Sequence, residues 1–425
     1  MKINELNAKI LNHELDEKIV DLYEDQDLLE YQRNRYLNTL NKFSEYYNDE
    51  EVVIYSAAGR SEIGGNHTDH QHGQVLAASI NLDGIAVVTK QERYVDVVSD
   101  DRKIERIDIE DLEKREAELS TSESLIRGVL FGLKRDGYKL GGFKAYITSD
   151  VLIGAGLSSS ASFEVLIGTI ISGLYNDNKI DNVTIAKIGQ FAENVYFGKP
   201  CGLMDQCACA VGGLINIDFK DPTKPVVKHL DVDFSKYGYS LCIVDTKGDH
   251  SDLTCEYASV PIEMKEVAHY FNQEYLRDVN PYDFYANIAN LRTKVNDRAI
   301  LRAHHYFNEH ERVSKLVNAL NTDDFESFKT YIEESGNSSY RYLQNVFASS
   351  DPLNQAVSLG LAISEMNLKG HGVCRVHGGG FAGTIQAFVE NDYVKTYQET
   401  IEKVFGVGTC HILKIRKYGG LEVIR

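Results

Sequence analysis

Residues able to do chemistry are dense in one stretch of this chain, EIGGNHTDHQHGQV, which runs from Glu62 to Val75. The stretch holds His67, His70 and His72 together with Asp69. Closely spaced imidazoles are typical of a transition-metal site, because imidazole suits zinc, copper and nickel. The alternative is a polar cradle, in which ring nitrogens and a carboxylate hydrogen-bond a ligand rich in hydroxyl groups. The stretch alone leaves both interpretations open.

A second candidate site is the glycine–serine stretch GAGLSSSAS, from Gly154 to Ser162. Glycines let the backbone turn its N–H groups inward, and the start of the following helix adds about half a positive charge. This combination suits phosphate groups, although no G-K-[ST] follows at the spacing of a Walker A loop. A plain serine-rich turn is the alternative, but such turns rarely lead into a long apolar helix. We therefore predict that phosphates bind this loop, through Gly154, Gly156, Leu157, Ser158, Ser159, Ser160 and Ala161.

Composition narrows the classes of protein that remain. A chain of 425 residues with 43% hydrophobic and 25% charged residues predicts a globular protein of two domains, or one large unit with insertions. The formal charge of −18 argues against a nucleic-acid or anionic-membrane surface, since both need clustered basic residues. The N-terminus has no signal-peptide core, and the longest apolar run, 165–175, is too short to span a bilayer. Seven scattered cysteines, an odd number, favour the reducing cytoplasm.

The elements that position these residues can be read from periodicity. Apolar residues at three- and four-residue steps predict helix from about residue 5 to 47. The strand patterns VVIYSA and GIAVVTK flank the histidine stretch, which is therefore expected in a loop between strands. Helices are predicted at 122–135 and through most of 256–366, and strands return around RVHGGGFAGTIQAFV. Strands and helices mix irregularly, which predicts an α+β fold.

Four motifs together resemble one family of kinases. The stretch AAGRSEIGGNHTDHQHGQVL, at 57–76, resembles the galactokinase signature, in which G-R precedes an I-G-x-H-T-D core. GAGLSSSAS resembles the phosphate loop of the wider family of galactokinase, homoserine kinase, mevalonate kinase and phosphomevalonate kinase (GHMP). CGLMDQ resembles the segment that carries the catalytic aspartate, and GGGFAG the third motif. The motifs follow the family's order, and they imply a ribosomal-protein-S5-like lobe over 1–235 and a ferredoxin-like lobe over 236–425.

The resemblance implies an ATP-dependent sugar 1-kinase that transfers phosphate directly to the anomeric oxygen. Asp205 matches the catalytic base, and Arg60 matches the arginine beside it. Mg²⁺ would accompany ATP, with Ser160 and Glu193 as protein ligands, because magnesium prefers hard oxygen donors. The partners are then a sugar and ATP, without nucleic acid or membrane, in a cytoplasmic monomer or weak homodimer.

The same resemblance answers the question raised by the histidines. His67 and Asp69 occupy the sugar-contacting positions of the H-T-D motif, and Tyr257 matches a tyrosine that closes the sugar pocket. A hydroxyl cradle is therefore favoured over a transition-metal site, which leaves His70 and His72 on the loop surface or behind the contacting residues.

The chain departs from the family pattern at three places in this loop, one of which is His70–Gln71 in place of a tyrosine–asparagine pair. Asn66 replaces a glutamate that contacts the far end of the sugar, and the family's N-L-I segment reads Glu62–Ile63–Gly64. The D-H-Q triplet resembles galacturonate kinases of the same family. We expect Asn66 to contact the substrate. D-Galactose is the expected sugar, and D-galacturonate is the alternative, because a missing carboxylate removes repulsion against a C6 carboxylate.

A galactose- and ATP-binding sensor without kinase activity is a third possibility. The complete serine loop beside Arg60 and Asp205 argues against it. The sequence leaves the roles of the N-terminal helices and of His377 open.

Overall fold

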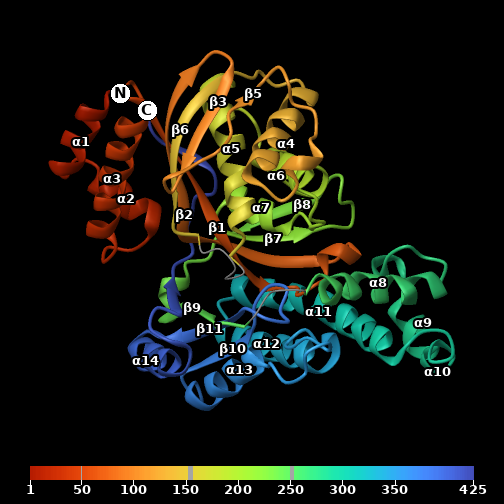
Figure 1. Ribbon diagram of the computed structural model, residues 1–425. Helices are drawn as coiled ribbons and strands as arrows, with labels where there is room; N and C mark the ends of the chain where they lie inside the picture. Colours follow the sequence, from red (N-terminus) through yellow and green to blue (C-terminus); the bar gives the residue numbers. More distant parts are fainter. Residues whose placement is uncertain (49, 152–156, 249–252) are drawn as a thin grey trace.

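The larger of two β-sheets organises the first half of the molecule (Figure 1). The computed structural model describes residues 1–48, 50–151, 157–248 and 253–425. In the larger sheet β13, β1, β2, β6, β3 and β4 lie side by side, β5 pairs with β3, and β7 pairs with β2 and β8. The strands are β1 (Val53–Gly64), β2 (Gln74–Gln91), β3 (Tyr94–Ser99), β4 (Arg102–Lys103), β5 (Ile107–Asp108), β6 (Gly142–Ser149), β7 (Leu214–Asp218), β8 (Val226–Leu230) and β13 (Leu421–Ile424).

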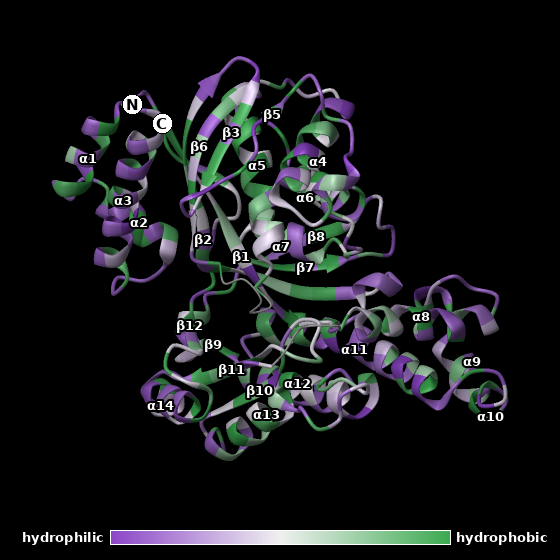
Figure 2. Ribbon diagram, in the orientation of Figure 1, coloured by the Kyte–Doolittle hydropathy of each residue, from purple (hydrophilic) through white to green (hydrophobic). Residues whose placement is uncertain are grey.

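Helices cover both faces of this sheet, because alternate side chains of a strand point to opposite faces. On β2, Ile85 and Val87 pack against the N-terminal helices α1 (Ile3–Leu11), α2 (Asp16–Tyr23) and α3 (Leu29–Tyr47). Ala86 and Val88 face the other layer. That layer consists of α4 (Ser122–Arg135), α5 (Ser159–Tyr175), α6 (Asn182–Phe191) and α7 (Met204–Val211). Figure 2 shows hydrophobic and hydrophilic turns alternating along α1–α3, as in amphipathic surface helices.

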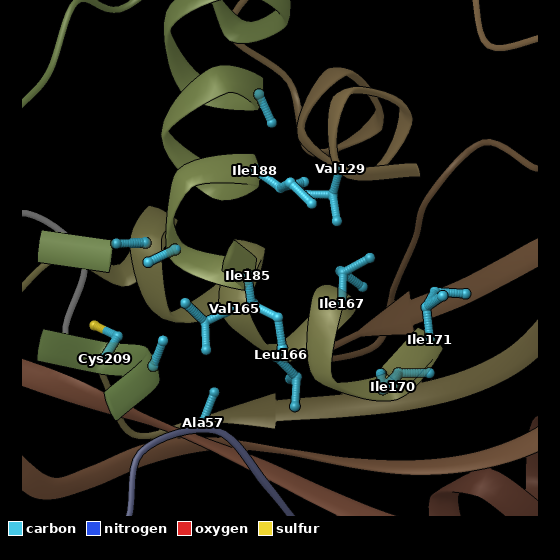
Figure 3. Packing of buried hydrophobic residues seen from close by; sticks show 14 of the residues in the cluster. Ala57, Val129, Val165, Leu166, Ile167, Ile170, Ile171, Ile185, Ile188 and Cys209 are labelled. Atoms are coloured by element: carbon cyan, nitrogen blue, oxygen red, sulfur yellow. The ribbon is translucent and has the colours of Figure 1, made fainter. Parts of the chain in front are cut away.

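Helix α5 is the centre of the larger core. Its residues Val165, Leu166, Ile167, Ile170 and Ile171 are at most 1% exposed. Figure 3 shows them pointing toward the sheet and toward the neighbouring helices. A helix that is apolar on all sides must be buried on all sides, so α5 holds its own N-terminus in a fixed place against the sheet.

The smaller sheet, in the order β10–β11–β9–β12, organises the second half. Its strands are β9 (Tyr239–Asp245), β10 (Gly372–Val376), β11 (Thr384–Glu390) and β12 (Cys410–Leu413). Helices α13 (Ala356–Asn367) and α14 (Val394–Phe405) cover one face. Helices α11 (Asp297–Asn321) and α12 (Phe325–Ser338) pack between the other face and the larger sheet. Helices α8 (Thr254–Tyr270), α9 (Pro281–Ala286) and α10 (Ile288–Leu291) extend beside α11 (Figure 1).

The C-terminus of the chain lies near its N-terminus. Strand β13 pairs with β1, so the last residues belong to the sheet built by the first half, and the two termini lie close together in Figure 1. The α+β prediction is confirmed. The helix predicted for 5–47 is present as three helices, separated near His13 and Glu24, which both have positive φ. The division at residues 235 and 236 stays a prediction. Among the described residues no helix is both long and apolar enough to cross a membrane.

Candidate functional site

Arg60 and Asp205 come together from distant parts of the chain. Arg60 lies on β1 and Asp205 in the first turn of α7. The Arg60 guanidinium donates from Nε to Oδ1 of Asp205 at 2.7 Å and from Nη2 to Oδ2 at 2.8 Å. Such a two-pronged contact fixes the orientation of both groups. The Asp205 side chain is 28% exposed and the Arg60 side chain 7%, so the carboxylate remains open to a ligand while the cation supports it from inside.

The charge on Asp205 is set by these neighbours. Burial by itself would raise the pKa of this carboxyl, but the Arg60 charge and the hydrogen bonds from Arg60 and Ser158 outweigh burial and lower the pKa below its usual value. The Ser158 hydroxyl donates to Oδ2 of Asp205. Asp205 is therefore an anion at neutral pH, as a proton acceptor must be.

The serine loop meets this pair at the start of α5. Ser158 has a φ of 58° and directly precedes the helix, which begins at Ser159. The first-turn N–H groups of a helix have no partner within it, and they attract anions. Leu157 and Ala161 are buried, whereas Ser159 and Ser160 are partly exposed. Of the predicted phosphate-binding residues, Gly154 and Gly156 lie outside the described residues.

Two oxygen groups of the kind that magnesium takes meet here, one on the first turn of α5 and one in the turn that follows α6. The Ser160 hydroxyl donates to Oε1 of Glu193 at 2.8 Å. Gln206 donates to the other oxygen of Glu193 at 2.8 Å, and Lys199 approaches Oε1 at 3.3 Å. Glu193 sits in a π-helical turn, residues 192–197, that continues α6, and it is 2% exposed. A hydroxyl and a carboxylate beside an anion-binding helix start fit a hard divalent cation that also carries phosphates.

The histidine stretch forms a loop between β1 and β2, as expected. His67 has a φ of 58°, and its Nε2 lies 3.0 Å from the carbonyl oxygen of Gly379. That carbonyl only accepts, so Nε2 carries the proton and Nδ1 accepts from Nε2 of His70, 3.3 Å away. His67 is thereby oriented by both of its neighbours.

Asp69 lies against the segment that leads to Asp205. A Cβ placed on Gly202 would come within 1.9 Å of Oδ2 of Asp69, so only a glycine allows this close approach. Burial first, and then the negative charge of Asp205, raise the pKa of Asp69 to about 6. Two carboxylates with opposite pKa shifts thus share one site, which is typical of functional centres.

Tyr257 contacts the third motif from the second half of the chain. It lies on α8, and its hydroxyl donates to the carbonyl oxygen of Gly380 at 3.0 Å. A Cβ on Gly379 would lie 2.6 Å from the Tyr257 ring. The third motif therefore holds both His67 and Tyr257 through its backbone.

Asn66, which is expected from the sequence to contact the substrate, contacts protein groups in the structure. Its side chain is 0% exposed, and its amide bonds to protein groups on every side. Its Nδ2 donates to Glu62 and to the carbonyl oxygen of Gly378, and its Oδ1 accepts from Ser339 and Asn345. Because both amide atoms are engaged, this side chain supports the loop from the protein interior.

One face of helix α11, which the sequence motifs did not indicate, contacts the backbone of this loop. Glu309 on α11 accepts from the backbone N–H of Gly65 at 3.1 Å, and Nε2 of His305 lies 2.9 Å from the carbonyl oxygen of Asn66. A signal was present in the sequence. Polar residues recur at helical spacing on α11 and are buried there, at Arg302, His305, Glu309 and Arg312.

The positions of the three histidines do not support a transition-metal site. His67 and His70 bond to each other, but His72 turns away and stacks on Tyr275, with ring centroids 3.6 Å apart. Within the described ranges, no group of three or more His, Cys, Asp or Glu side chains is placed to hold a metal ion. His377, whose role was open, is buried, and its Nε2 accepts from the backbone N–H of Glu62 on β1.

Comparisons with known proteins agree with these motifs. A family model described as the GHMP kinases N terminal domain matches residues 124–213, and the galactokinase galactose-binding signature matches residues 41–90. A galactokinase of Streptomyces coelicolor is 30% identical over 374 residues, covering 86% of this chain and 91% of the relative. A galactokinase of Actinobacillus pleuropneumoniae is 31% identical over 373 residues, covering 85% and 91%.

Solved structures share the fold. The Lactococcus lactis galactokinase complexed with galactose superposes with a TM-score of 0.77 at 24% identity, covering 92% of this chain and all of that one. A mevalonate kinase superposes with a TM-score of 0.59 at 14% identity. The arrangement of two sheets is therefore shared across distant sequences.

Proposed function

This chain belongs to the galactokinase family of the GHMP kinases, and from that premise we propose that it converts D-galactose and ATP to α-D-galactose 1-phosphate and ADP. The observation that carries the proposal is the two-pronged contact of Arg60 with Asp205, directly beside the start of α5. A base, a cation and an anion-binding helix start are the three parts that phosphoryl transfer requires.

Asp205 acts as the base in this proposal. Its carboxylate accepts the proton of the anomeric hydroxyl as that oxygen attacks the γ-phosphorus in line. Arg60 keeps Asp205 ionised and offsets charge on the transferring phosphate. The bond from the γ-phosphorus to the bridging oxygen of ADP breaks as the bond to C1–O forms, so no phosphoenzyme is needed.

The remaining residues bind and orient. The loop from Gly154 to Ala161 carries the phosphates of ATP. Ser160 and Glu193 would hold Mg²⁺, whose charge lowers the repulsion among the phosphate oxygens. His67, Asp69 and Tyr257 bind the sugar hydroxyls. We further propose a cytoplasmic enzyme, monomeric or weakly dimeric, with its lobes divided near residue 235.

A panel of sugars and uronic acids, each incubated with Mg-ATP and scored for the 1-phosphate, tests this function. We expect D-galactose to be the preferred acceptor.

Asp205→Asn should lower kcat by about a thousandfold, because general base catalysis contributes about 10² to 10⁴, while galactose binding measured by calorimetry persists. Phosphorylation at C6 would contradict the mechanism. Sugar binding without turnover by the unmodified protein would instead identify a sensor.

A further inference from the structure

A buried charge pair joins the end of β1, where the histidine loop begins, to the smaller sheet. Nη2 of Arg375 on β10 donates to Oε1 of Glu62 at 2.5 Å, and its Nη1 donates to the carbonyl oxygen of Ile63 at 2.8 Å. Arg375 is 0% exposed and Glu62 is 3% exposed. A buried cation and a buried carboxylate persist only when each compensates the other.

Asn66 completes this pair on its other side. Its Nδ2 donates to Oε1 of Glu62 at 3.1 Å and to the carbonyl oxygen of Gly378 at 2.6 Å. Its Oδ1 accepts from Asn345 at 2.9 Å and from Ser339 at 3.2 Å. A carboxamide has two N–H donors and two lone pairs, so these four contacts use the full hydrogen-bonding capacity of Asn66.

Positions 62 and 66 hold one carboxylate and one carboxamide between them. The Glu62 carboxylate faces Arg375, and the Asn66 carboxamide faces a backbone carbonyl that only a donor can satisfy.

We propose that Asn66 is a positioning residue, and that Glu62, Asn66 and Arg375 form one bridge that sets the place of His67 against Gly379. Asn66 therefore does not select between a C6 hydroxyl and a C6 carboxylate, and substrate selection falls to the residues that follow it in the loop. The proposal rests on the proposed function only for its kinetic readout.

Isosteric exchanges test the bridge without changing side-chain volume. The proteins are the unmodified enzyme, Glu62→Gln, Asn66→Asp and the double variant. Glu62→Gln removes the carboxylate that contacts Arg375, and Asn66→Asp sets a second carboxylate against Glu62. Each single change should lower the midpoint of thermal unfolding and raise KM for galactose about tenfold, since coupling within a buried network is worth a factor of this size. KM for ATP should stay near that of the unmodified enzyme.

The double variant restores one carboxylate and one carboxamide across positions 62 and 66. We expect it to lose less than the two single variants together, both in unfolding midpoint and in KM for galactose. The Gly378 carbonyl still faces an oxygen in that variant, so recovery should be partial. Additive losses would overturn the bridge. Asn66→Glu tests specificity, because a change in the ratio of galactose to galacturonate turnover would overturn the positioning role.

The thermal measurements separate this proposal from the kinase function. If no sugar is phosphorylated by the unmodified protein, the function proposed above fails, but the unfolding midpoints of the four proteins still report whether Glu62 and Asn66 are coupled. If galactose is phosphorylated and the midpoints are additive, the bridge alone fails.

Discussion

At the scale of single residues, the site separates two carboxylates by their environments. Asp205 is held ionised by Arg60 and Ser158, which lower its pKa, whereas burial and the nearby Asp205 charge raise the pKa of Asp69 to about 6. Groups with opposite shifts suit different tasks. The low-pKa carboxylate is ready to take a proton, and the other can accept hydrogen bonds at both of its oxygens only after it has lost one.

This separation predicts a pH profile with two parts. Below pH 6 free enzyme with protonated Asp69 accumulates, so kcat/KM for galactose should fall about tenfold per pH unit, because this ratio reports the free enzyme. At saturating galactose, kcat should stay level to lower pH, since Asp205 keeps its charge there. Stopped assays from pH 4.5 to 8 measure both quantities. Asp69→Asn should lose the limb near pH 6, and its persistence would assign that limb to another group.

Sequence motifs led to Arg60, Asp205, Ser160 and Glu193, and the structure brings these side chains into two contacting pairs. Their roles stay predictions. The surroundings of Asn66 could not be predicted from the sequence alone, since its partner Gly378 lies 312 positions away. Whether a loop amide faces a ligand or the protein depends on such long-range contacts, which local spacing does not contain.

At the scale of elements, α11 positions the loop through a buried polar stripe. Glu309 accepts from the N–H of Gly65 at 3.1 Å and from the Ser335 hydroxyl at 2.6 Å, and it also pairs with Arg312. Burial alone would raise the pKa of Glu309, but the Arg312 charge is the largest of several neighbours that lower it to about 2.

Glu309→Gln should therefore destabilise the protein in a pH-dependent way. The stabilisation by Glu309 is fully present above the ordinary glutamate pKa and is lost as pH falls toward about 2. At pH 7 the loss should be about 3 kcal/mol, because removing one partner leaves a buried charge uncompensated. Denaturant unfolding at pH 7 and pH 3 measures the difference, which should shrink at pH 3. Glu311→Gln is the matched control, since Glu311 forms an exposed pair with Lys315 on the same helix. Equal effects of the two changes would remove the special role of Glu309.

Periodicity predicted most elements but not their pairing. The helix expected at 122–135 matches α4 (Ser122–Arg135), and the strands that flank the histidine loop match β1 and β2. The π-helical turn at Glu193 and the pairing of β13 with β1 were not predicted. Both depend on tertiary packing, which outweighs local preference wherever two arrangements differ little in local energy.

At the scale of the whole molecule, one carboxylate joins segments from both ends of the chain. Asp83 is 0% exposed, and it accepts from Nη1 of Arg35 on α3 at 2.7 Å and from Nη1 of Arg416 at 2.8 Å. The hydroxyls of Tyr23 on α2 and Ser56 on β1 also donate to it. The N-terminal helices are thereby tied to the strand layer that carries Arg60, which gives them a structural role.

Asp83→Asn tests whether this junction holds the ends together. Neutralising Asp83 removes the charge that pairs with Arg416 and leaves Arg35 with Asp150, 3.0 Å away, and breaking a buried ion pair costs about 3–5 kcal/mol. Asp101→Asn is the control, since Asp101 forms an exposed pair with Lys42 on α3, and exposed pairs contribute about 0–1 kcal/mol. Hydrogen exchange should show α1–α3 losing protection in Asp83→Asn before the rest of the larger sheet, because these helices depend on the junction, whereas α5 has its own core. If α5 lost protection together with α1–α3, the junction would support the entire lobe and not its N-terminal layer alone.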